Sequence, residues 1–107
     1  MEIDVTEIND VLVIKPRFRR LDAAIAPAFR DHVAARVTGR QRVVFALGNV
    51  DFMDSSGLGS IVSVLKQLPA GGVVRLAEVS AGLQKVLRLT RLEAVLQSFS
   101  NVEQAVA

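Results

Sequence analysis

The chain contains no cysteine, no tryptophan, no tyrosine and only one histidine among its 107 residues. Without cysteine it cannot form disulfides, cysteine metal sites or a thiolate nucleophile, which fits a reducing compartment. With one histidine, any metal site would depend on carboxylates. The core must therefore consist of Leu, Val, Ala and Ile with a few Phe, a composition that suits helices packed on a sheet.

Long apolar runs are also absent. No segment approaches the roughly 18 to 20 residues of a membrane span, and the acidic, alternating start over residues 1–8 lacks both parts of a signal peptide. We therefore expect a cytoplasmic protein with no direct membrane insertion. A chain of this length predicts one domain, residues 1–107.

The net charge is only +2, but residues 15–42 carry eight bases and two acids. The basic run Lys15–Arg20 contains one aromatic residue and no recognised nucleic-acid motif. Such runs are usually solvated faces, so we expect no nucleic-acid partner.

Hydrophobic spacing predicts alternating strands and helices. An opening hairpin turns at Asn9-Asp10. Asp22 is a candidate N-cap for a helix that stops at Gly39. On this helix, His32 is expected to be half buried and structural. The further elements expected are a buried strand at 43–47, a helix with apolar residues from Leu58 to Leu68, a strand at 73–79, a helix with inner positions 83, 86, 87 and 90, a strand at 95–99, and a capping box at 100–103 opening a helix to 107. This order predicts an α/β fold with a mixed, mostly parallel sheet of about four to five strands and about four helices.

The junction Asp51–Gly59, between the central strand and its helix, holds two acids, two serines and two glycines. Asp51 and Asp54 could ligate Mg²⁺, but two carboxylates in a turn are more often caps. Gly57-Leu-Gly59 is a weak match to a phosphate loop. A serine hydrolase would need a base beside Ser55 or Ser56, and His32 is the only imidazole.

Ser55 and Ser56 can be plain residues of a helix N-terminus, or they can be the substrate of another enzyme. If Asp54 caps the helix, Ser55 occupies the first helical position with its Oγ outward, where a kinase can reach it. Phosphate would add about −1.5 to −2 charges. The helix N-terminus favours that anion while the neighbouring acids oppose it, so the fold should survive while a docked partner would be repelled.

Asp51-Phe-Met-Asp-Ser-Ser-Gly-Leu-Gly59, between a buried strand and an amphipathic helix, resembles the signature of STAS-domain anti-sigma factor antagonists, also called anti-anti-sigma factors. The order of elements agrees along nearly the whole chain, including Leu21-Asp-Ala23 and Asn101–Ala105. The resemblance implies a small mixed sheet with helices packed mainly on one side.

The resemblance also implies a bacterial partner-switching protein rather than an enzyme. Its phosphoacceptor would be Ser55, with Ser56 the less favoured position. The partners implied are a serine kinase that is also the anti-sigma factor and a PP2C-type phosphatase, with ATP and Mg²⁺ belonging to the kinase and no cofactor on this chain. The unphosphorylated form would bind the kinase and release its target. The kinase-binding residues expected are Asp22, Asp51, Asp54, Ser55, Ser56, Gly57, Leu58 and Gly59.

The chain departs from the family pattern at several positions. Phe18-Arg-Arg20 replaces a small or glycine-containing segment, Ala46 stands where an acid is common, and Arg91 replaces a glycine. We hypothesise that Arg19 and Arg20 lie beside the Ser55 loop and help to select an acidic partner. An alternative function is a STAS adaptor subunit that supports a membrane transporter ATPase by docking without phosphorylation.

Overall fold

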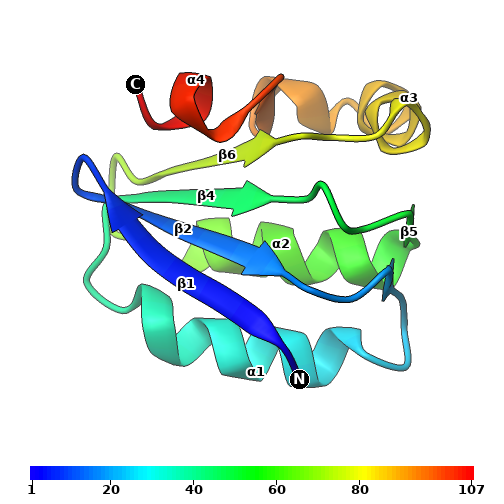
Figure 1. Cartoon of the computed structure of the whole chain (residues 1–107), viewed down its shortest axis with the longest axis horizontal. Coiled ribbons are helices and arrows are strands. Elements are labelled where there is room, and N and C mark those ends of the chain that lie inside the picture. The colour runs from blue at the N-terminus through cyan, green and yellow to red at the C-terminus, as the bar shows by residue number, and fades with distance from the viewer.

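A computed structural model describes all residues from Met1 to Ala107. Its main sheet has five strands in the order β1-β2-β4-β6-β7. Figure 1 shows the first four of these strands, β1, β2, β4 and β6, in this order. The β1–β2 pair is antiparallel and the other neighbours are parallel, so the expected mixed, mostly parallel sheet is confirmed. The strands are β1 (Ile3–Ile8), β2 (Val11–Pro16), β4 (Arg42–Ala46), β6 (Val73–Ala77) and β7 (Gln97–Phe99).

Asn9 and Asp10 form the hairpin turn, with φ values of 52° and 65°. Asn and Asp tolerate this left-handed conformation better than most residues, and it matches the twist of a two-residue hairpin. The strand β2 ends at Pro16, which cannot donate to a ladder. The predicted opening hairpin is therefore confirmed.

The chain also contains four α-helices and one short 3₁₀ helix. They are α1 (Ala26–Val37), α2 (Ser55–Gln67), α3 (Ala81–Leu89), η1 (Leu92–Ala94) and α4 (Val102–Val106). The helices α1, α2 and α3 contribute to a 19-residue core that includes Leu12, Phe45 and Leu76 of the sheet. The helix α4 contributes to a second core of seven residues that includes Val44. The helices thus lie mainly on one side of the sheet, as expected.

A second, two-stranded sheet was not anticipated. It pairs β3 (Arg20–Leu21) in parallel with β5 (Phe52–Met53). Segments of two residues carry no periodicity, so the sequence gives no signal for them. This small sheet fixes the chain before α1 beside the chain before α2.

Several local predictions were wrong. Asp22 does not cap α1, because it lies in a preceding turn and accepts from the N–H of Ala24, while Ile25 is the N-cap residue. His32 is exposed, and Val33 takes the inward position. Thr90 is exposed and closes α3 as its C-cap.

The buried stripe of α2 is also rotated from the one expected: Val64 is buried, whereas Val62 and Leu65 are half buried. The strand expected at 73–79 ends at Ala77, where Glu78 adopts a positive φ of 60°. At α4 the cap is Asn101 rather than Ser100, because Asn101 accepts from the N–H of Gln104. None of the helices is long and apolar enough to span a membrane.

Candidate partner-docking site

The N-terminus of α2 presents two serines on an ordered turn. Asp54 is the N-cap, and its Oδ1 accepts from the backbone N–H of Gly57 at 2.9 Å. Ser55 is therefore the first residue of the helix, as predicted, and both Ser55 and Ser56 are exposed. Neither serine side chain makes a hydrogen bond within the chain, so a change at either hydroxyl removes no internal contact.

Asp54 also ties two distant loops together. Its Oδ2 accepts from the backbone N–H of Ala23 at 3.1 Å, across 31 residues of sequence. The bond from Gly57, supported by those from Ala23 and Ser56, holds the pKa of Asp54 below its ordinary value of 3.8, against the opposing effect of desolvation. Asp54 is therefore a structural carboxylate at neutral pH.

Gly57 is required by close packing. A Cβ built at this position would lie 2.1 Å from the carbonyl oxygen of Leu21 and 2.8 Å from Cγ of Met53. Gly59, in contrast, has no neighbouring atom within 4 Å of such a Cβ. The first glycine lets α2 approach the end of β3, whereas the second leaves an open position on the helix surface.

The arginines Arg19 and Arg20 lie beside this turn, as hypothesised, but their charges are already paired. Arg19 donates to Asp51 at 2.6 Å, and Arg20 donates to Asp22 at 3.3 Å. The Arg20 guanidinium also stacks over the Phe52 ring, 4.3 Å from its centroid. The contacts of Arg19 with Asp51 and of Arg20 with Phe52 bridge the two segments of the small sheet, so both arginines have structural partners on this chain.

The residues expected to bind a partner therefore gather on one surface, formed by the ends of β3 and β5 and the start of α2. Asp51, Ser55, Ser56 and Gly59 are exposed on it, and Asp22 and Asp54 are partly buried. Gly57 and Leu58 are buried and support the surface from beneath.

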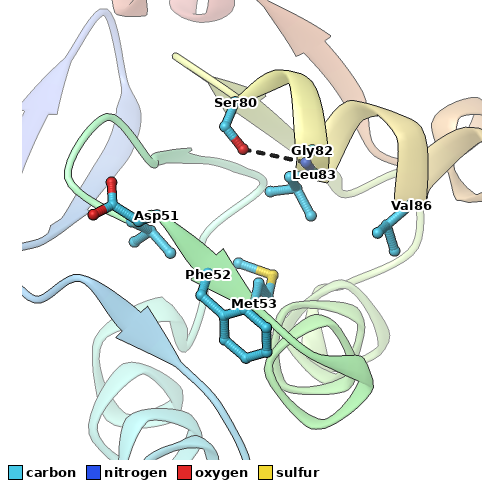
Figure 2. Close-up of a pocket in the computed structure, with 8 residues that line it drawn as sticks. Asp51, Phe52, Met53, Ser80, Gly82, Leu83 and Val86 are labelled. Atoms are coloured by element: carbon cyan, nitrogen blue, oxygen red, sulfur yellow. Dashed lines mark hydrogen bonds between the residues drawn. The ribbon is translucent and has the colours of Figure 1, made fainter.

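Hollows that were not anticipated flank this surface, and two of them lie beside α3. A cavity of about 210 Å³ lies between β5 and the first turns of α3, and Figure 2 shows Met53, Leu83 and Val86 around it. A groove of about 410 Å³ runs between α2 and the segment after α3, lined by Ser55, Val62, Lys66, Thr90 and Leu92 among others. Sequence periodicity predicts which face of each helix packs on the sheet, but it carries no information about gaps between helices. The sequence therefore could not predict either hollow.

Comparison with known proteins gives a consistent match. Residues 2–105 match the STAS domain family. The chain is 26% identical over 102 residues to a candidate anti-sigma factor antagonist of Thermotoga maritima, covering 92% of this chain and 89% of that protein.

Solved structures of anti-sigma factor antagonists have a similar fold. An anti-sigma-factor antagonist (STAS) domain protein from Planctomyces limnophilus is 29% identical, with a TM-score of 0.88 and coverage of 97% of this chain and 93% of that chain. The unphosphorylated anti-sigma factor antagonist SpoIIAA has the same fold, with a TM-score of 0.72, 20% identity and coverage of 96% and 92%. The phosphorylated form of this Bacillus protein also gives a TM-score of 0.72, with 21% identity and coverage of 98% and 96%.

Proposed function

The chain belongs to the STAS domain family, and from that membership we propose that it is a phosphorylation-switched binding protein of a bacterial partner-switching pathway. Residues 1–107 act as one domain in the cytoplasm. In the unphosphorylated state, the surface around Ser55 binds a serine kinase that is also an anti-sigma factor, and this frees the target of that protein. Phosphorylation of Ser55 ends the binding, and a PP2C-type phosphatase restores it.

The observation that carries the proposal is the position of Ser55. Its hydroxyl is exposed at the first residue of α2, directly after the capping Asp54, and no side chain of the fold depends on it. A kinase can therefore modify it without unfolding the chain. The homologous protein of Thermotoga maritima is itself a candidate anti-sigma factor antagonist, which supports the same class of function.

The proposed switch acts through charge at a contact. A phosphate adds about −1.5 to −2 charges beside Asp51 and Asp54. At the helix N-terminus this anion is tolerated. A partner packed against the same turn would have to desolvate the anion or face it with like charge, which weakens association strongly. The chain itself catalyses nothing in this scheme, because the kinase brings ATP and Mg²⁺.

The test uses the serine kinase encoded nearest to this chain. After incubation with that kinase and ATP, intact mass should rise by one phosphate for the wild-type chain and for Ser56→Ala, but not for Ser55→Ala. In a binding assay with the same kinase, Ser55→Ala should retain affinity, whereas Ser55→Asp should lose at least about tenfold.

The matched Ser56→Ala variant distinguishes the two neighbouring hydroxyls. If the phosphate persists in Ser55→Ala and disappears in Ser56→Ala, the phosphorylation site is Ser56 rather than Ser55. Equal kinase binding by the Ser55→Asp variant and the wild-type chain would refute a phosphorylation switch at Ser55, and would favour an adaptor that docks without modification.

A further inference from the structure

The cations of this chain divide into those with acceptors and those without. Arg17, Arg19, Arg20, Arg30 and Arg40 form ion pairs with carboxylates on the chain. Arg42 and Arg75 donate to backbone carbonyls of α4 and the residue that follows it. The remaining six, which have neither kind of acceptor, are Lys15, Arg36, Lys66, Lys85, Arg88 and Arg91.

Three of these six lie within seven residues on α3 and the turn that follows. Lys85 and Arg88 are three residues apart on the helix, so they lie on adjacent turns of one face. Arg91 follows the end of the helix, where it is exposed at a positive φ of 60°. Glu93, the nearest acid in the sequence, forms no ion pair with any of them.

The same segment carries the most exposed large apolar side chain of the molecule. Leu89 is 74% exposed, and it lies four residues after Lys85 and one after Arg88. The inner face of α3 is supplied by Leu83 and Leu87, which are buried, so Leu89 is not needed for the core. An exposed leucine between unpaired cations resembles the centre of a binding surface rather than a solvated helix face.

We call Lys85, Arg88, Leu89 and Arg91 the basic edge, and its Arg91 end adjoins the groove beside Ser55. Thr90 and Leu92, which flank Arg91 in the chain, line that groove opposite Ser55 and Val62. Lys66, another cation without an acceptor, lines the groove as well. The groove beside Ser55 therefore carries one cation without an acceptor, Lys66, and adjoins a second, Arg91.

We infer that the basic edge is a second docking surface, which binds an acidic segment of the partner protein that places an apolar side chain against Leu89. This inference rests on the proposed function for the identity of the partner. Charge complementarity selects the occupant: three cations without counterions attract carboxylates and accelerate encounter, while Leu89 lengthens the lifetime of the complex. Arg19 and Arg20 differ from these cations because each already has a carboxylate partner on the chain.

A membrane surface is the competing class of occupant. An anionic bilayer would also attract three cations, but stable interfacial binding requires a long amphipathic apolar face. The nine residues of α3 offer Leu89 alone as a strongly exposed apolar side chain. The protein partner is therefore the better fit.

The experiment compares two double charge reversals with equal change in net charge. Lys85→Glu with Arg88→Glu alters the basic edge, and Lys15→Glu with Arg36→Glu alters two equally unpaired cations on β2 and α1. Association with the purified kinase is followed at salt concentrations from about 0.05 to 0.5 M. We expect the edge variant to associate about tenfold more slowly at low salt, with a flatter salt dependence, and the control variant to resemble the wild-type chain.

Leu89→Ala should accelerate dissociation about tenfold with little change in association. Its matched control is Ile8→Ala. Ile8 is an apolar residue, 39% exposed, on the edge strand β1 of the main sheet. Backbone hydrogen exchange of residues 81–92 should slow when the kinase is bound, and phosphatidylserine vesicles should not bind the wild-type chain.

The outcomes separate the two proposals. Loss of kinase binding in Ser55→Asp together with unchanged kinetics in the edge variants would overturn this inference and leave the proposed function standing. Equal slowing by both double reversals would also overturn it, because the effect would then follow net charge. Binding of vesicles that the edge reversal abolishes would assign the surface to membranes instead. Absence of kinase binding by the wild-type chain would refute the proposed function, on which this inference depends.

Discussion

Gly57 is the residue of the candidate docking site at which a larger side chain would disturb the packing most directly. A methyl group there would meet the Leu21 carbonyl oxygen at 2.1 Å, a backbone atom that can move only with β3. We expect Gly57→Ala to lower the free energy of unfolding by about 1–3 kcal/mol, and Tm by roughly 5 to 20 °C. Urea unfolding followed by circular dichroism measures this change.

Gly59→Ala is the matched control for that substitution. It lies on the same helix, in open space, so alanine should raise stability by about 0.5–1 kcal/mol through its higher helix propensity. Equal destabilisation by both substitutions would show that the effect at Gly57 comes from the helix rather than from contact with β3.

Asp54 makes stability depend on pH in a defined direction. Its pKa is lowered in the folded chain, mainly by the Gly57 N–H, so the unfolded chain binds protons more readily. Its contribution is complete above the ordinary value of 3.8 and is lost as pH falls through the lowered pKa. Asp54→Asn keeps an acceptor but cannot ionise.

We therefore expect the wild-type chain to exceed the Asp54→Asn variant in stability by a constant amount near neutral pH. That difference should shrink once pH falls below 3.8. Urea midpoints of both proteins at stepped pH values measure it. A difference that stays constant down to the acid-unfolded state would contradict an ionised cap.

At the scale of the element, α2 should tolerate charge at its first position. Ser55→Asp adds an anion where the helix N-terminus is favourable, by about 0.3–1 kcal/mol, while Asp51 and Asp54 oppose it. We expect the free energy of unfolding to change by less than about 0.5 kcal/mol. Ile61→Ala, which removes a fully buried side chain from the same helix, should cost about 2–5 kcal/mol.

This pair of measurements tests whether a switch at Ser55 acts on binding or on folding. If Ser55→Asp destabilised the chain as much as Ile61→Ala, loss of partner binding in that variant would have to be attributed to unfolding. Circular dichroism in urea, under identical conditions for both variants, gives the comparison.

At the scale of the whole molecule, β4 joins two cores. Val43 and Phe45 face the large core beneath α1 and α2, whereas Val44 and Ala46 face the small core beneath α4. Because one strand supplies both, we expect the two cores to unfold together. Val44→Ala should cost about 1.5–3 kcal/mol.

The Val44→Ala substitution should lower the stability of both faces equally. Methyl NMR signals of Val106, in the small core, and of Ile61, in the large core, should disappear at the same reduced urea concentration. If the Val106 signal moved alone, α4 would be a separately melting element. Ile8→Ala, at the exposed end of β1, should leave both midpoints nearly unchanged.

The sequence alone predicted the five strands of the main sheet and the four α-helices in their order, because hydrophobic spacing, turn residues and caps are local properties. Asn9-Asp10 specified the hairpin, the run at 43–47 a buried strand, and Asp54 the start of α2. The nine residues from Asp51 to Gly59 also sufficed to indicate the family. The exposed position of Ser55 followed from the cap, since the first turn of a helix is ordered by the residue before it.

Features that depend on contacts between distant residues became evident only in the folded chain. The two-residue strands β3 and β5 exist because they pair with each other, and the Ala23 bond to Asp54 spans 31 residues. Val33 is buried on α1, whereas His32 is exposed. Arg19 and Arg20 form ion pairs with carboxylates on the chain, whereas Arg88 on α3 forms none. Long-range pairing determines which charges and side chains remain free for a partner, and no local pattern records it.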